Sequence, residues 1–325
     1  MPKGEYLQYG GQALIEGVMM RSPHFFSVAC RAPNGEIIIE TESIEKTWIG
    51  RQKWLKLPFL RGSLALLDSM ALGIRAMKFA SNIQISPEFQ PLGSGFAPAT
   101  AGQKKVQEVT IGATLVVSLV IGFALFNYLP NTVAEYAHRM LHLPEGYRTT
   151  NFIAEMVKAV LFFGYIAAIG QLPDVREVFK YHGAEHKAIN TLEADRPLEM
   201  EECLRQTRLH PRCGTSFMIL VLLLGFVVFT FLPRYPLGQH SFALIDVTIR
   251  VFLELCILPF IAGVAYELLR LAGRFRSQKA VMLLFSPGLA TQYLTTREPE
   301  ERQVQVALAA LRSCIAAETG SGHRL

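Results

Sequence analysis

Four long apolar stretches dominate the chain after its first hundred residues. They cover approximately residues 109–129, 152–172, 215–232 and 245–269. At about 1.5 Å of rise per residue, a helix of each length crosses most of the hydrocarbon layer of a membrane. The pattern predicts an integral membrane protein built on a four-span α-helical bundle.

The N-terminal region alternates apolar and polar positions with the period of a β-strand. Strands are expected at residues 12–20, 25–31 and 36–41, and Asn34-Gly35 between the last two is a strong hairpin signal. Glu16, inside the first strand, faces either solvent or a metal site. Gly10, Gly11 and Gly17 indicate either tight turns or close approach of the backbone to a ligand.

The apolar stretch at residues 64–80 is interrupted by Asp68, Arg75 and Lys78, and Arg61 belongs to a basic patch before it. This combination predicts an amphipathic helix at the membrane surface rather than a fifth span. Residues 86–108, rich in Pro, Gly, Ser and Ala, are expected to form a flexible linker.

The C-terminal tail returns to soluble character. Ser286-Pro287-Gly288 is expected to break the chain, and residues 295–299 resemble a capped helix start. The apolar stripe of the helix that follows predicts packing on the N-terminal region, and its members are Val304, Leu308, Leu311 and Ile315. The expected division of the chain is 1–85, the linker 86–108, the membrane region 109–269 with its connection 173–214, and the tail 270–325.

Composition and charge predict how the chain is oriented in the membrane. Half of the residues are hydrophobic, 18% are charged and the mean hydropathy is +0.27. Of 32 Lys and Arg residues, 12 precede the first span, 7 lie in residues 173–214 and 8 follow the last span, against 2 in residues 130–151 and 1 in residues 233–241. The positive-inside rule therefore predicts a multi-pass protein of the cell membrane with both termini and the 173–214 connection in the cytoplasm. The net charge of +5 gives no reason to expect nucleic-acid binding.

Two predicted spans carry charged residues. Asp246, Arg250 and Glu254 recur every four residues on one face of the fourth span, and Glu155 and Lys158 lie in the second. Such groups face the interior of a bundle, usually in pairs. They form either a salt-bridge ladder that fixes helix packing or a polar path for an ion or substrate.

The candidate chemistry lies in the 173–214 connection. His182, Glu185 and His186 form an H-x-x-E-H motif, and positions i and i+4 share one face of a helix, so both imidazoles can bind one metal ion. Glu185 can then act as a general base that is not itself a ligand. His210 and Cys213 follow at a spacing that also suits coordination. The alternative interpretation is that the histidines are solvated or cap helices.

These blocks resemble a known family. Residues 10–21, 181–187, 210–217 and 294–299 are similar, in the same order, to the signature blocks of the YqhQ-like bacterial membrane proteins, which share domain of unknown function 1385. The resemblance runs from Gly10 to about Leu311. It implies a metal-dependent protein with His182, His186, His210 and Cys213 as metal-site positions and Glu185 as the acid/base.

Two functions follow as hypotheses. The first is a membrane-bound hydrolase at the cytoplasmic face. A divalent ion is held by His182, His186 and either His210 or Cys213, and zinc is expected because it binds imidazole and thiolate ligands. Coordination by all four residues would instead make a closed, structural site. The second is a non-enzymatic transporter or membrane scaffold. The expected partners are the lipid bilayer, an unidentified substrate and, in a homo-oligomer, further copies of the chain.

Overall fold

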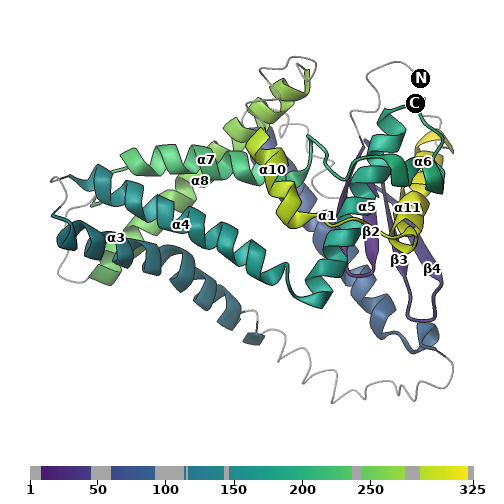
Figure 1. Cartoon of the computed structure of the whole chain (residues 1–325), viewed down its shortest axis with the longest axis horizontal. Coiled ribbons are helices and arrows are strands. Elements are labelled where there is room, and N and C mark those ends of the chain that lie inside the picture. Colours follow the sequence, from purple (N-terminus) through teal and green to yellow (C-terminus); the bar gives the residue numbers. More distant parts are fainter. Residues whose placement is uncertain are drawn as a thin grey trace.

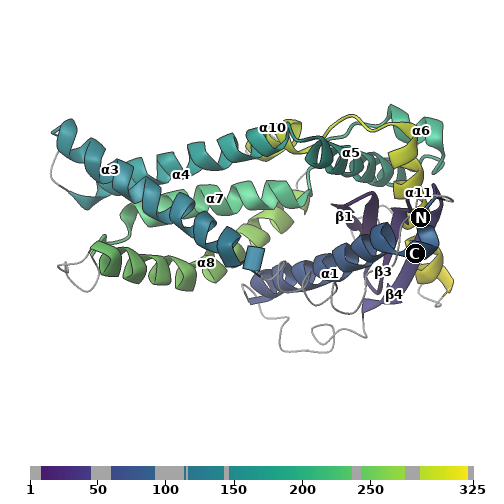
Figure 2. The same cartoon turned by 90° about the horizontal axis from the view of Figure 1, so that it is seen from below.

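The protein has two parts, a bundle of long helices and a region built around a small sheet (Figures 1 and 2). The computed structural model describes residues 9–44, 60–91, 113–114, 116–142, 146–235, 243–274 and 286–320. Most of the predicted linker at residues 86–108 lies outside these ranges, and the part inside them contains the short helix η4 (Pro87–Phe89).

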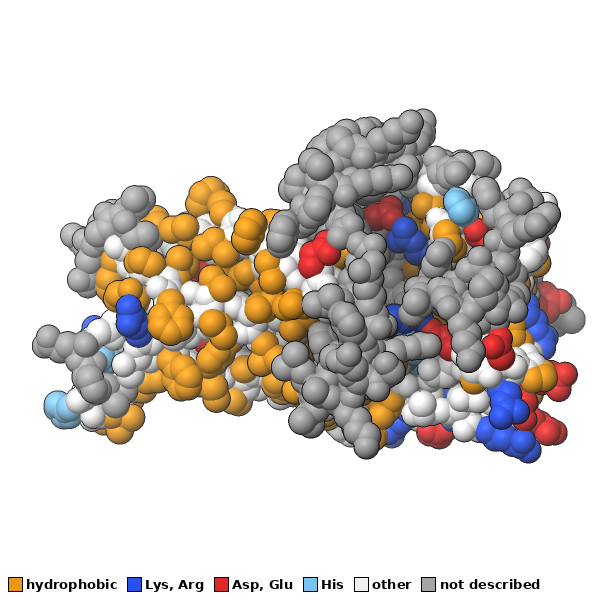
Figure 3. Space-filling view, turned by 90° about the horizontal axis from the view of Figure 1, so that it is seen from above, with side chains coloured by type: hydrophobic (Ala, Val, Ile, Leu, Met, Phe, Trp, Pro, Cys, Tyr) orange, Lys and Arg blue, Asp and Glu red, His pale blue; other side chains and the backbone are white. Residues whose placement is uncertain are grey.

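Four helices of the described residues are long and apolar enough to cross a membrane. They cover Val116–Met140, Tyr147–Ile169, Gly214–Phe231 and Ile245–Leu269. The first consists of an α-helical stretch at residues 116–123, the π-helical turn η5 (Ala124–Tyr128) and α3 (Leu129–Met140). The other three are α4 (Tyr147–Ile169), α7 (Gly214–Phe231) and α8 (Ala243–Arg274). Hydrophobic side chains cover the visible face of the bundle, whereas charged side chains gather at the sheet end (Figure 3).

The predicted end of the first span near residue 129 is wrong, because the helix continues to Met140. Proline lacks the amide hydrogen that an α-helix interior needs, so a helix commonly ends or kinks near a residue such as Pro130. The chain instead widens into η5 immediately before this residue and places Pro130 in the first turn of α3. A π-helical turn changes the hydrogen-bonding pattern locally, so the proline does not stop the helix.

The sheet is a four-stranded antiparallel meander in the order β1 (Gly10–Leu14), β2 (Gly17–Arg21), β3 (Phe25–Arg31) and β4 (Ile37–Ser43). The predictions for β3, β4 and the Asn34-Gly35 turn are confirmed, with Gly35 at a φ of +94°. The single strand predicted at residues 12–20 is wrong, because Leu14 pairs with Gly17 across a two-residue turn. Glu16 occupies that turn at a φ of +50°.

Both faces of the sheet are covered. Helix α1 (Leu60–Ile85) packs Leu72, Ala76 and Ala80 on one face and leaves Leu67, Met70 and Ile74 exposed. On the other face lie α5 (Pro173–Glu193), the short α6 (Met200–Arg205) and α11 (Glu301–Gly320). The predicted packing of Val304, Leu308 and Leu311 on the N-terminal region is confirmed, since all three are buried in this core.

The tail differs from its prediction at two points. Residues 286–288 do not break the chain but begin a helix, α10 (Ser286–Thr295). The capped start predicted at residues 295–299 falls on the last residue of α10 and on the irregular residues that follow it, and α11 begins at Glu301. Pro287 lies in the first turn of α10, a position that proline tolerates because the amide there has no helical partner.

A ladder of hydrogen-bonded ion pairs joins α4 to α8. Lys158 Nζ donates to Glu155 Oε1 at 2.8 Å and to Glu254 Oε2 at 3.1 Å. Arg250 continues the ladder by donating to Glu254 Oε1 at 2.9 Å and to Asn151 Oδ1 at 2.6 Å. Glu155, Lys158, Arg250 and Glu254 therefore lie between the two helices and satisfy one another.

Candidate metal centre

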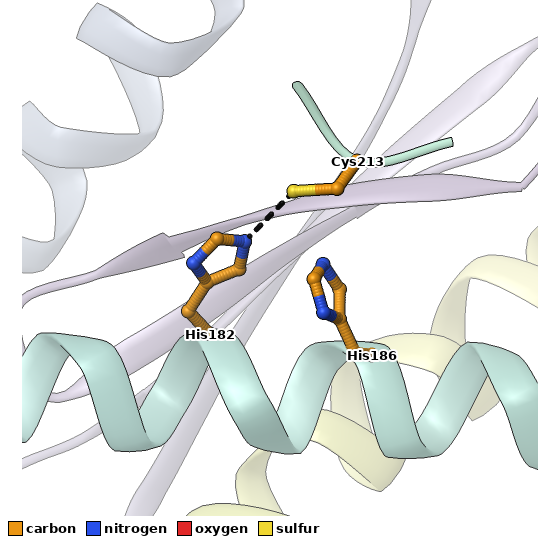
Figure 4. Close-up of side chains that lie close together, drawn as sticks. All are labelled: His182, His186 and Cys213. Carbon is orange, nitrogen blue, oxygen red and sulfur yellow. Dashed lines mark hydrogen bonds between the residues drawn. The ribbon is translucent and has the colours of Figure 1, made fainter. Parts of the chain in front are cut away.

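Helix α5 presents His182 and His186 one above the other. The two residues are four positions apart, so their side chains leave the helix on the same face, and their ring centroids lie 4.5 Å apart. Both point toward Cys213 (Figure 4).

Cys213 comes from the other side of the site, at the N-cap of α7. Its Sγ lies 3.1 Å from His182 Nε2, and one ligand atom from each of His182, His186 and Cys213 lies within 4.8 Å of the other two. The Thr215 hydroxyl, at 3.2 Å, and the Thr215 backbone amide, at 3.5 Å, donate to the same sulfur. The start of α7 and the middle of α5 thus bring together three potential ligand atoms, one each from Cys213, His182 and His186.

Backbone carbonyl groups fix the tautomer of both imidazoles. His182 Nδ1 lies 2.9 Å from the carbonyl oxygen of Thr295, and His186 Nδ1 lies 2.6 Å from that of Arg208. A carbonyl oxygen only accepts, so each Nδ1 carries the hydrogen and each Nε2 keeps a lone pair. Metal-binding histidines in proteins are commonly oriented by a hydrogen bond of this kind.

His186 is buried, and its burial disfavours the charged imidazolium. Its side chain is 1% exposed, and burial lowers its pKa below the ordinary value of 6.5. Its Nε2 meets no hydrogen-bond partner of normal geometry among the residues that the structure describes, and the nearby Cys213 side chain is the group that interacts with the ring. A buried nitrogen lone pair without a donor is costly, and a cation at the centre of the cluster would satisfy it. The donor set therefore fits a metal ion.

Glu185 lies beside the ligand cluster but outside it. The carboxyl group packs against Gly11 of β1, where an added Cβ would come within 2.8 Å of Glu185 Cγ and 2.9 Å of Cδ. Burial raises the pKa of Glu185, opposed by His182, His210 and a hydrogen bond from the Gly11 backbone. The sequence left open a tight turn or an approach to a ligand at Gly11, and in the structure its backbone lies against the Glu185 carboxyl group.

His210 does not join the three-residue cluster. Its ring centroid lies 5.7 Å from that of His186, and its Nε2 lies 3.5 Å from Glu193 Oε1. Arg212 forms an ion pair with the same Glu193 carboxylate. The sequence left open whether His210 or Cys213 completes the ligand set, and the geometry favours Cys213.

Gly183 explains how the C-terminal segment reaches the site. An added Cβ on Gly183 would lie 2.1 Å from the carbonyl oxygen of Arg297, so only glycine allows this segment to pass. Along the same side of α5, the Arg297 amide donates to the Phe179 carbonyl at 2.9 Å, and Lys187 pairs with Glu298 at 2.6 Å. These contacts hold Thr295 where its carbonyl oxygen meets His182.

Gln292 of α10 is a supporting residue that the sequence did not reveal. It is fully buried, and its side chain accepts from the His210 amide at 2.8 Å and donates to the His210 carbonyl at 2.7 Å. A second bond runs from Gln292 Nε2 to Ser216 Oγ at 3.1 Å. The sequence predicted only a break at residues 286–288 and no role for the residues after it, so nothing marked Gln292 as a clamp on the loop that carries Cys213.

Glu16 fits neither predicted role. Its carboxylate accepts a hydrogen bond from the Tyr181 hydroxyl at 3.0 Å, one residue before the first ligand of α5. It therefore ties the β1–β2 turn to α5 instead of facing the metal cluster.

Comparison with known proteins places the chain in a family. Residues 57–317 match the family described as "Protein of unknown function (DUF1385)". The "Uncharacterized protein YqhQ" of Bacillus subtilis (strain 168) is 32% identical over 306 residues, which cover 92% of this chain and 90% of that protein. No solved protein structure matches the chain. The chain belongs to the DUF1385 family.

Proposed function

We propose that this protein is a membrane-bound, metal-dependent hydrolase that works at the cytoplasmic face of the cell membrane. One observation carries the proposal: His182 Nε2, His186 Nε2 and Cys213 Sγ converge, while both Nδ1 atoms are held by carbonyl groups. Two imidazoles oriented in this way and a thiol are the ligands of a transition-metal centre.

Zinc is the ion that suits this donor set best, because it accepts nitrogen and sulfur ligands in tetrahedral geometry. Three protein ligands leave one tetrahedral position for water or substrate, which is the pattern of catalytic zinc. The position of His210 beside Glu193, outside the cluster, supports this open arrangement over a closed structural one. The bound ion would supply a Lewis acid toward water and toward the carbonyl or phosphoryl group of the substrate.

Glu185 supplies the proton transfer. Its carboxylate accepts a proton from the attacking water and returns it to the leaving group, so the reaction consumes one water and releases two products. Burial raises the pKa of Glu185 and thus its affinity for that proton. Gly11 holds the carboxyl group in place from the sheet side.

Several features support the membrane location. The four candidate spans carry exposed apolar side chains, among them Leu119, Val160, Phe252 and Phe260. Cys213 lies immediately before α7, so the ligand cluster lies at the end of the bundle nearest the sheet. That end also carries the excess of Lys and Arg that marks cytoplasmic segments.

The ion-pair ladder between α4 and α8 favours a structural role over a transport path. Arg250 is 3% exposed and donates hydrogen bonds to Glu254, Asn151 and the Phe229 carbonyl. Charges that satisfy one another in this way stabilise helix packing in a bilayer. The transporter hypothesis therefore has less support than the hydrolase hypothesis.

Replacement of Glu185 tests the proposed chemistry. In proteoliposomes supplied with chromogenic carboxylic and phosphoric esters, Glu185→Gln should lower the hydrolysis rate about 100-fold to 10,000-fold, the usual contribution of a general base. Its metal content should equal that of the wild type, because Glu185 is not a ligand. The exposed Glu201→Gln on α6 is the matched control and should retain full activity. Hydrolysis that survives Glu185→Gln unchanged contradicts the mechanism.

A further inference from the structure

An elongated cavity of about 340 Å³ lies between α4, α7 and α8. Its walls are apolar side chains apart from Glu155 and Lys158. Lys158 Nζ lies 5.8 Å from the centre of the Phe229 ring, so the ion pair marks the end of the cavity that is farther from Cys213.

The length of the cavity follows from the residues of α7 that line it, which run from Phe217 to Phe229. Twelve residues of α-helix correspond to about 18 Å. One leaflet of a bilayer contributes about 15 Å to a hydrocarbon layer of about 30 Å. The cavity is therefore slightly longer than one leaflet is thick, which is long enough for one extended acyl chain.

The near end of the cavity leads toward the metal centre. A smaller hollow shares Phe162 and Met218 with the cavity and is also lined by Thr215 and Thr295. The Thr215 hydroxyl donates to Cys213, and the Thr295 carbonyl accepts from His182. Figures 1 and 2 show α10 at this junction, where α4 and α7 meet the sheet region.

The charges in the cavity are already paired. Lys158 donates to Glu155 and to Glu254, so the ion pair offers little to a polar ligand. An apolar acyl chain needs no hydrogen-bond partner. Its contact with the apolar walls of the cavity is favourable because it removes apolar surface from water.

We propose that this cavity binds one acyl chain of a phospholipid from the cytoplasmic leaflet, and that this phospholipid is the substrate class of the metal centre. The acyl chain lies along α7 with its terminal carbons near Lys158. The headgroup and the ester linkages lie at the other end of the cavity, near His182, His186 and Cys213. The assignment of this phospholipid as the substrate rests on the proposed hydrolase function, whereas the binding of its acyl chain in the cavity does not.

Photo-crosslinking tests the binding of the acyl chain in the cavity without any measurement of activity. The full-length protein is reconstituted in vesicles of phosphatidylethanolamine and phosphatidylglycerol that contain a phospholipid with a diazirine in one acyl chain. After irradiation, adducts are mapped by peptide mass spectrometry, and the metal content of the same preparation is measured. In the wild type, adducts should concentrate on the cavity-lining positions of α7 and α8.

Two glycines give a matched pair of variants. An added Cβ on Gly225 would lie 3.4 Å from the Phe229 ring, so Gly225→Leu fills the cavity without a backbone clash. Gly164 on α4 is exposed with open space around it, so Gly164→Leu adds the same bulk outside the cavity. Ala262→Leu on α8 is a second filling variant.

The filling variants should reduce adducts at the cavity positions about tenfold, which corresponds to about 1.4 kcal/mol of lost contact, while Gly164→Leu should leave them unchanged. Equal labelling in all variants would indicate annular bilayer contact only and overturn the inference, even if metal is bound. The expected loss of labelling in a protein that binds no metal would uphold the lipid site and contradict the hydrolase function.

Discussion

Gly183 determines how closely the C-terminal segment approaches the metal ligands of α5. Its missing side chain leaves room for the carbonyl oxygen of Arg297, two residues after the Thr295 carbonyl that orients His182. The glycine costs the helix about 1 kcal/mol relative to alanine, so its presence inside the motif indicates a packing requirement.

Gly183→Ala should therefore destabilise the protein by about 1–3 kcal/mol, because the overpacked segment must move. It should also weaken metal binding about 10-fold to 100-fold as Thr295 leaves His182. Gly164→Ala, in open space on α4, is the control and should be neutral or slightly stabilising. Chemical unfolding in detergent and metal titration measure both effects. A Gly183→Ala variant as stable as Gly164→Ala would contradict this packing role.

Sequence reasoning identified part of the candidate site at the residue scale. The spacing of His182 and His186 predicts a shared face because helical periodicity is a local property. The choice between His210 and Cys213 depends on the fold of a loop clamped by Gln292 from a distant helix. The carbonyl groups of Thr295 and Arg208 have no side-chain signature at all, so no motif could indicate them.

At the scale of elements, the apolar pattern located the spans but not all their ends. The prediction for α4 and α7 lies within a few residues of the structure because apolar runs and loops alternate clearly there. The first candidate span extends beyond its predicted end because the π-helical turn η5 lies just before Pro130 and the helix continues through α3. A π-helical turn leaves no simple sequence pattern. The β1–β2 hairpin was missed because its turn contains Ile15 and Glu16 rather than the usual glycine or asparagine.

The ladder between α4 and α8 gives a prediction about an element pair. Arg250→Ala should destabilise the bundle by about 3–5 kcal/mol, because it leaves buried Glu254 and Asn151 with fewer partners. The double variant Arg250→Met with Glu254→Leu should lose less, since Lys158 keeps Glu155. Unfolding in mixed micelles measures both. An Arg250→Ala variant of unchanged stability but without function would favour the transport path instead.

At the scale of the whole molecule, the proposed hydrolase has its metal centre and its sheet on the cytoplasmic side. The Lys and Arg distribution predicts this orientation, whereas the assembly of the sheet region depends on contacts between distant segments, and its elements are β1–β4, α1, α5, α6 and α11. Such contacts have no local signature beyond the apolar stripe of α11.

Thiol labelling tests this orientation. In whole cells that carry the Cys256→Ser background, a membrane-impermeant maleimide should label Gln239→Cys, in the 233–241 loop predicted to lie outside. It should label Glu201→Cys, on the exposed surface of α6, only after the membrane is made permeable. Labelling of Glu201→Cys in intact cells would reverse the orientation and remove the metal centre from the cytoplasm.

The central claim is that His182, His186 and Cys213 form a metal centre, and elemental mass spectrometry of the detergent-purified protein tests it most directly. The wild type should contain about one equivalent of zinc or another transition metal, in keeping with one three-ligand site. The metal should be lost in His182→Ala, His186→Ala and Cys213→Ala and retained in His210→Ala, because His210 faces Glu193. No stoichiometric metal in the wild type, even after reconstitution with zinc, would contradict the claim.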